Sequence, residues 1–204
     1  LCDPAAKVSC HYLVLEDGRC LQLVPEVERA WHAGLSSWQG ETDINSCSIG
    51  IEIANPGHDF GYPDFAGPQM AALEALCRDI VARRGIAPAR VLAHSDVAPL
   101  RKADPGEKFD WARLARAGVG LYVDPEPVAE GAVLGPGDEG DEVAALQHDL
   151  ARMGYKVGQS GCFAEETRAV VTAFQRHFRP QRVDGIADFS TVSTLKKLLP
   201  MFIP

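Results

Sequence analysis

A change of pattern after residue 117 constrains the fold of this chain more than any other feature. Strand-like and helical segments alternate before it, and only helical patterns follow residue 140. Between them the chain is rich in proline, glycine and acidic residues, a composition typical of linkers. We therefore predict an α/β domain over residues 1–117, a linker over 118–139 and a small all-α domain over 140–204.

The first part begins with two strand-like runs, at residues 8–15 and 20–24, that Asp17-Gly18 can join as a tight hairpin. A helix with apolar residues at three- and four-residue spacing is predicted to begin at Pro68 and to end before Gly85. A further strand at 90–94 and a helix at 110–117 complete the α/β pattern.

Residues 48–54, SIGIEIA, predict a short strand with one unusual face. The isoleucines point one way, while Gly50, Glu52 and Ala54 point the other. A glutamate in a strand is usually solvated. Here both neighbours on its face are small, which leaves room for a bound group, and we favour a cleft over Glu52.

Apolar spacing in the last part predicts three amphipathic helices, the first of them closed by Gly154. Gly161 and Thr167 recur twenty-four residues later as Gly185 and Thr191, each pair leading into a helix. This indicates a small duplicated helical unit. The apolar residues of the three helices are Val143, Leu146, Leu150 and Met153; Val170, Val171, Phe174 and Phe178; and Val192, Leu195, Leu198 and Leu199.

The loop after the strand at 90–94 carries the residues most suited to chemistry. His94 is a potential metal ligand, Lys102 a cation and Asp104 a carboxylate, all within residues 91–111. A catalytic zinc usually takes three protein ligands and leaves one position for water. Two candidates are present here, so a third must come from elsewhere. His11 lies in the first strand, where a histidine is more often packed or hydrogen-bonded than a ligand.

The motif RAWHAG offers a second candidate surface. Trp31 could stack on a carbohydrate ring and His32 could donate a hydrogen bond. The alternative is a buried tryptophan beside a surface histidine, and the residues alone do not decide between the two.

Composition excludes several classes of function. A formal net charge of -8 argues against nucleic-acid partners, which need a basic face. No apolar run approaches the roughly 18 residues that span a bilayer. The six cysteines show no CxxC spacing, so a cysteine-based zinc or redox motif is not expected, whereas a disulfide between two of them stays open.

Residues 8–111 resemble the zinc-dependent type 2 N-acetylmuramoyl-L-alanine amidases in five motifs that occur in the order of that family: VSCHYLVLEDG, RAWHAG, NSCSIGIEIANPG, YPDFAGPQ and HSDVAPLRKADPGEKFDW. The resemblance implies a mixed central sheet flanked by helices. Residues 134–199 are similar to a small three-helix peptidoglycan-binding domain found beside many wall hydrolases. Both resemblances imply peptidoglycan or muropeptides as the partner.

The resemblance also implies roles for individual residues. His94 and Asp104 match two of the three zinc ligands of the family, and Glu52 matches the carboxylate that takes a proton from water and passes it to the leaving amine. Lys102 matches the cation that stabilises the oxyanion of the tetrahedral intermediate. Less directly, and by analogy with the family, Trp31, His32 and Asn45 become candidates for binding the muramoyl sugar or the stem peptide.

One ligand of the family has no match in this sequence. The first zinc ligand is a histidine in a strand that precedes the VSxHY strand, and the sequence begins at Leu1 without that strand and without an initiator methionine. Three explanations compete: the chain is a fragment, the strand is a separate piece, or the metal has been lost. We expect truncation, with the third ligand upstream of Leu1.

Two functions from different classes follow. The first is zinc-dependent hydrolysis of the amide between the lactoyl group of N-acetylmuramic acid and L-alanine. The second is a non-catalytic peptidoglycan-binding or muropeptide-binding module. The joint presence of His94, Lys102, Asp104 and Glu52 favours the enzyme, because a pure binder has no need of this set. We expect a monomer that is exported to the periplasm or cell envelope, where a wall-binding tail is useful.

Overall fold

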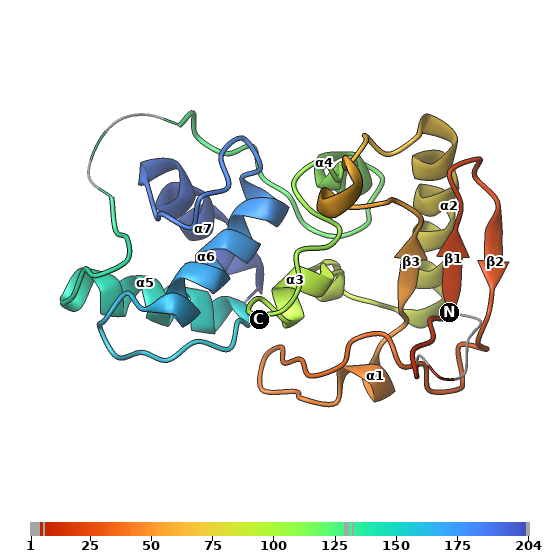
Figure 1. Ribbon diagram of the computed structural model, residues 1–204, viewed down its shortest axis with the longest axis horizontal. Coiled ribbons are helices and arrows are strands. Elements are labelled where there is room, and N and C mark those ends of the chain that lie inside the picture. Colours follow the sequence, from red (N-terminus) through yellow and green to blue (C-terminus); the bar gives the residue numbers. More distant parts are fainter. Residues whose placement is uncertain (1–4, 6, 129–130, 132, 203–204) are drawn as a thin grey trace.

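The computed structural model describes residues 5, 7–128, 131 and 133–202. Its sheet has three short strands, β1 (Tyr12–Val14), β2 (Cys20–Gln22) and β3 (Ile51–Ile53), in the order β2-β1-β3 (Figure 1). β1 runs antiparallel to β2 and parallel to β3. The predicted hairpin and the predicted mixed sheet are thereby confirmed.

One long helix, α2 (Gly67–Arg84), packs against the sheet behind β1 and β3 (Figure 1). Pro68 occupies its first turn, where a missing N–H costs nothing, and Gly85 ends it in the left-handed conformation with φ of 64°. These bounds confirm the helix predicted from the spacing of its apolar residues. Neither α2 nor any other helix in the described part of the chain is long and apolar enough to cross a membrane.

Short elements connect the longer ones. They are α1 (Ile44–Cys47), the 3₁₀ turns η2 (His58–Phe60) and η3 (Pro88–Arg90), α3 (His94–Val97) and α4 (Trp111–Arg116). The helix predicted at 110–117 is confirmed by α4.

The strand predicted at residues 90–94 is wrong. Val91 and Ala93 have extended backbone angles, but the segment pairs with no strand among the described residues. A strand needs a hydrogen-bonded neighbour, and an apolar run by itself does not supply one. His94 does not end a strand; it begins the single turn α3.

The core of the first part lies between α2 and the sheet and continues under α4. It is formed by buried apolar side chains from β1, α2, α4 and the segments around them. Ile51 and Ile53 of β3 pack against this core, as the alternation of SIGIEIA predicted. The buried members are Val14, Met70, Leu73, Cys77, Ala93, Phe109, Trp111, Leu114 and Val119.

Three helices form the last part: α5 (Asp141–Met153), α6 (Glu165–Phe178) and α7 (Phe189–Phe202) (Figure 1). Gly154 follows the last residue of α5, as predicted. Of the twelve apolar residues expected to face the core, all are buried except Val192, which is partly buried.

The structure supports the duplicated unit with a repeated hydrogen-bond motif. The side chain of Gln147 donates to Thr167 Oγ1 at 2.8 Å and accepts from the N–H of Gly161 at 2.9 Å. The side chain of Gln175 likewise donates to Thr191 Oγ1 at 3.2 Å and accepts from the N–H of Gly185 at 2.8 Å. Each glutamine therefore ties the turn before a helix to the first residues of that helix.

The helical part packs directly on the α/β part. Trp38, Val97 and Ala98 belong to the same buried cluster as the apolar faces of α5, α6 and α7. The Trp38 ring meets the ring of Tyr155 edge-on, with centroids 4.9 Å apart. The division into domains stays a prediction, but one of the two buried clusters contains residues of both parts.

The described cysteines, Cys10, Cys20, Cys47, Cys77 and Cys162, are all free thiols. Cys2 lies outside the described residues. Within the described part of the chain, the fold is therefore held by packing and hydrogen bonds, without a disulfide.

Candidate functional site

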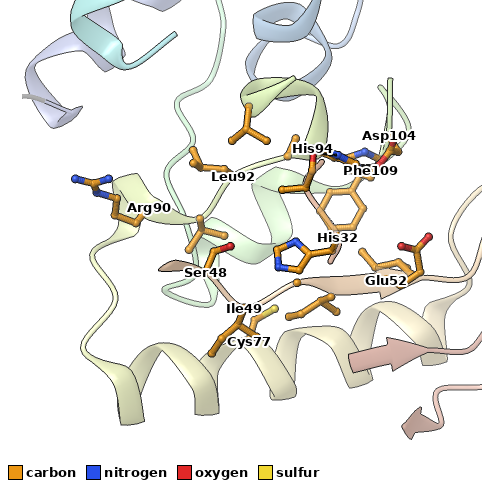
Figure 2. A pocket seen from close by; sticks show the side chains of 18 of the residues that line it. His32, Ser48, Ile49, Glu52, Cys77, Arg90, Leu92, His94, Asp104 and Phe109 are labelled. Atoms are coloured by element: carbon orange, nitrogen blue, oxygen red, sulfur yellow. Dashed lines mark hydrogen bonds and ion pairs between the residues drawn. The ribbon is translucent and has the colours of Figure 1, made fainter. Parts of the chain in front are cut away.

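A cavity of about 1630 Å³ opens between β3, α2 and the segment that leads into α3. β3 pairs only with β1 among the described strands, and its residues line this cavity. Figure 2 shows His94 and Asp104 side by side, and the carboxylate of Glu52 points from β3 toward the side of the pocket that carries them. The structure thus brings four of the predicted site residues, His32, Glu52, His94 and Asp104, to one cavity.

His94 and Asp104 are in direct contact in the site. His94 Nδ1 lies 2.9 Å from Asp104 Oδ2. The N–H of Ser95 also donates to the backbone oxygen of Asp104, at 3.1 Å, so α3 and the loop after it are tied at this point. A nitrogen and an oxygen from two separate segments therefore converge on one place.

The surroundings of His94 fit a metal ligand. Its Nε2 lies 3.1 Å from the backbone oxygen of Ala33, so both ring nitrogens face oxygen acceptors. A neutral imidazole carries one N–H and can donate to only one of them. A cation held by Nδ1 and the carboxylate of Asp104 would resolve this conflict. Nε2–H would then donate to Ala33, the backbone contact that orients many metal-binding histidines.

The described residues offer fewer than the three side-chain ligands that a catalytic zinc usually takes. No group of three histidine, cysteine or acidic side chains that could hold a metal exists among them. His11 accepts from the N–H of Gly50 through Nδ1 at 3.0 Å, and its Nε2 contacts the backbone oxygen of Glu28 at 3.0 Å. Both nitrogens are thus used, which agrees with leaving His11 out of the ligand set.

Burial and neighbouring charges shift the pKa values of the two carboxylates in opposite directions. Burial would raise the pKa of Asp104, but the hydrogen bond and the charge of His94 lower it below its usual value. Partial desolvation raises the pKa of Glu52, and repulsion from Asp104 adds to this. The charge of Lys102 acts on both carboxylates and favours their ionised forms. One carboxylate is thus suited to stay ionised beside a cation and the other to exchange a proton.

His32 fills the space above Gly50. A Cβ on Gly50 would lie 2.3 Å from the Cγ of His32, so the small residue just before β3 makes room for this ring. Desolvation, together with the charges of His11 and His94, lowers the pKa of His32 to about 4. Its Nε2 is buried and has no partner among the described residues. His32 therefore presents a neutral ring with one unsatisfied nitrogen in the wall of the cavity.

Trp31 and Asn45 take different positions from His32. The Trp31 ring is 55% exposed, and the guanidinium of Arg29 lies over it, 4.2 Å from the ring centroid. Asn45 is buried, and its Oδ1 accepts from the N–H groups of His32 and Ala33 at 2.9 and 2.8 Å. Asn45 therefore holds the loop that carries His32 and the oxygen that orients His94.

Two cavity-lining residues, His58 and Tyr62, were not predicted from the sequence. Tyr62 and His58 line the cavity, and their rings stack with centroids 4.2 Å apart. A Cβ on Gly106 would lie 2.3 Å from the Tyr62 hydroxyl, so this glycine permits the close approach. Nothing in the sequence around Gly106 indicated which aromatic residue would lie against it.

Comparison with known families agrees with this geometry. The family described as N-acetylmuramoyl-L-alanine amidase matches residues 1–107, and a peptidoglycan binding domain family matches residues 139–195. The N-acetylmuramoyl-L-alanine amidase AmiD of Escherichia coli (strain K12) is 42% identical over 212 residues, which cover 96% of this chain and 75% of AmiD.

Solved structures give the same relationship. AmiD from E. coli, in complex with the substrate anhydro-N-acetylmuramic acid-L-Ala-D-gamma-Glu-L-Lys, matches with a TM-score of 0.80 and 39% identity, over 95% of this chain and 80% of that one. AmpDh3 from Pseudomonas aeruginosa, in complex with anhydromuramic pentapeptide, matches with a TM-score of 0.79 and 29% identity, over 97% and 84% of the two chains. From its sequence, its fold and the cavity around Glu52, His94 and Asp104, this chain belongs to the N-acetylmuramoyl-L-alanine amidase family.

Proposed function

We propose that this protein hydrolyses the amide bond between the lactoyl group of N-acetylmuramic acid and L-alanine in peptidoglycan, with zinc as its metal. The observation that carries the proposal is the His94–Asp104 pair, 2.9 Å apart, in a cavity also lined by Glu52. The relatives AmiD and AmpDh3, solved with anhydromuramyl peptides, support this class of substrate.

Two residues of this chain would hold the metal. His94 would bind it through Nδ1 and Asp104 through its carboxylate, while Ala33 would accept from Nε2–H and keep the imidazole oriented. A zinc ion in such a site lowers the pKa of water toward neutrality and polarises the carbonyl under attack. The Asp104 carboxylate stays ionised under these conditions because its pKa is lowered.

The remaining roles belong to a proton carrier and a cation. Glu52 takes the proton of the attacking water and delivers it to the nitrogen of L-alanine as the C–N bond breaks. Its raised pKa brings it closer to the working pH, which suits a group that must both accept and donate. Lys102 stabilises the negative oxygen of the tetrahedral intermediate, a charge that exists only during the reaction.

The substrate contacts follow from exposure. Trp31 presents an open ring, held by Arg29, on which a sugar can stack. His32 lines the cavity, so its ring can contact a ligand bound there. Asn45 acts through the loop that it holds, because its side chain is buried and occupied.

The test uses the full-length protein and digested peptidoglycan analysed by chromatography. We expect release of stem peptides with a free L-alanine amine, loss of this activity with a chelator, and recovery with zinc. Asp104→Asn should abolish cleavage and weaken zinc binding. If the peptidoglycan stays intact and no peptide is released at any zinc concentration, the proposal is contradicted.

One observation favours a second candidate, a muropeptide-binding module without catalysis. The described residues contain no complete set of three metal ligands. This alternative predicts that the full-length protein sediments with purified wall, contains no zinc and releases no peptide. Zinc content and peptide release are therefore measured on the same preparation as wall binding.

The C-terminal helices would serve the same substrate. The match of residues 139–195 to a peptidoglycan binding domain family supports wall binding by α5, α6 and α7. We place the protein in the cell envelope, where its relatives' substrate lies, and in the periplasm within it. Fractionation that recovers the protein only with the cytosol would contradict this location.

A further inference from the structure

A buried carboxylate joins the candidate site to the C-terminal helices. Asp96 lies two residues after His94 in the single turn α3, and its side chain is fully buried. Figure 1 shows α3 between the sheet of the first part and the helices of the last part. The carboxylate therefore sits at the boundary between the two.

Three donors reach this carboxylate. The Tyr155 hydroxyl donates to Oδ1 at 2.6 Å, and the Nδ1–H of His177 donates to Oδ2 at 2.7 Å. The N–H of Ala93 donates to Oδ2 at 2.8 Å, which closes the turn that begins at His94. Two of the three donors thus come from the C-terminal helical part, and the third comes from the backbone of the loop that carries the candidate ligand.

The two side-chain donors are themselves held in place. The His177 ring stacks on Trp111 with centroids 3.7 Å apart, and both residues are buried. The Tyr155 ring packs edge-on against Trp38 at 4.9 Å, and Tyr155 is 3% exposed. A buried carboxylate that loses a donor is left with uncompensated charge, so the turn α3 would shift to regain a partner.

We propose that Tyr155 and His177 are positioning residues of the amidase site: they hold Asp96, and through it the turn α3, so that His94 meets Asp104. The inference rests on the proposed function and extends it, since it gives the C-terminal helices a part in catalysis that is separate from wall binding. Residues that orient a metal ligand from behind typically change metal affinity or activity by about 10- to 100-fold when they are removed.

The decisive variant is Tyr155→Phe in the full-length protein, because it removes one hydroxyl and keeps the ring on Trp38. We expect zinc affinity, measured by competition with a chelator, to fall about 10-fold. With a small soluble muropeptide as substrate, kcat should fall while KM stays nearly constant, and sedimentation with purified wall should be unchanged. The cobalt-substituted variant should show an altered visible absorption spectrum, which reports the ligand geometry directly.

Thr167→Val is the matched control. It also removes one buried hydroxyl from the C-terminal helices, but the partner there is Gln147, whose other hydrogen bonds go to Gly161 and Cys162 and not to α3. We expect a comparable loss of stability, with zinc affinity, the cobalt spectrum and kcat as in the wild type. His177→Phe, which keeps a ring for Trp111 and loses the donor, should behave as Tyr155→Phe does. His177→Asn restores an N–H near the same place and should recover part of the affinity.

Two results would overturn the proposal, and they are distinguishable. In the first, Tyr155→Phe and His177→Phe lose stability as the control does, while zinc affinity, spectrum and kcat remain those of the wild type; Asp96 would then only hold the two parts together. A wild-type protein that neither binds zinc nor cleaves muropeptides would overturn the proposed function, and this inference with it.

Discussion

Glu52 is the side chain proposed to carry the proton in this site. It stands on β3 in a cavity also lined by the His94–Asp104 pair, and among the described residues it forms no ion pair. We expect Glu52→Gln to lower kcat by about 10²- to 10⁴-fold, the usual contribution of a positioned acid–base group. Zinc content should be unchanged, because His94 and Asp104 hold the metal. An active Glu52→Gln variant would exclude this residue as the proton carrier.

The raised pKa of Glu52 gives the reaction a defined pH dependence. The general base works only when it is ionised, and partial desolvation moves its ionisation to higher pH than that of an ordinary glutamate. The rate should therefore fall as the pH is lowered through this raised pKa. A profile of kcat/KM against pH for a soluble muropeptide measures this acidic fall in rate, and Glu52→Asp should shift the pH at which it occurs. If Glu52→Asp shows the fall at the same pH as the wild type, another group causes it.

At the scale of elements, the close contact between β3 and the loop of His32 depends on Gly50. A Cβ at this position would lie 2.3 Å from His32 Cγ, so Gly50→Ala forces the strand and the loop apart. We expect a loss of about 1 to 3 kcal/mol in the free energy of unfolding, as for other overpacked sites. Gly67→Ala is the control, because a Cβ there meets nothing within 4 Å. Equal stability of the two variants in urea would contradict this account.

A second link between elements joins the segment after β2 to the end of α2. The Glu26 side chain is 6% exposed and is bound by Arg83 and Arg84, at 2.8 and 2.6 Å, and by the Tyr12 hydroxyl at 2.7 Å. These bonds hold the pKa of Glu26 well below its usual value in the folded state. Its contribution is therefore complete above the pKa of an unfolded glutamate and is lost as the pH falls through the folded value.

Glu26→Gln should consequently lower stability near neutral pH by about 1 kcal/mol, a modest value because the two arginines are partly exposed. The difference between variant and wild type should shrink as the pH is lowered into the acid range. Urea unfolding at several pH values measures both quantities. A difference that stays constant with pH would rule out the ionised carboxylate as its cause.

At the scale of the whole molecule, one buried apolar cluster joins the parts on either side of the predicted linker. Trp38 of the first part is 1% exposed and packs on Tyr155 and Phe202 of the last part. We expect a single calorimetric unfolding transition for both parts, and Trp38→Ala should lower stability by about 3 to 5 kcal/mol. Two separate transitions in the wild type would show that the parts unfold independently.

Local patterns in the sequence determined the elements whose causes are local. The Pro68 and Gly85 signals bounded α2, Asp17-Gly18 placed the hairpin, and apolar spacing located the three C-terminal helices. The motifs around Glu52, His94 and Asp104 were also sufficient to indicate the family.

Only the tertiary structure decided what depends on distant neighbours. Val91–Ala93 reads as a strand, yet it has no described partner, because pairing is a property of two segments. Nothing near Asp96 in the sequence points to Tyr155 and His177, which lie 59 and 81 residues away. The physical reason is the same in both cases: local propensity acts within a few residues, whereas burial and hydrogen bonding of a polar group are settled by whatever the folded chain brings beside it.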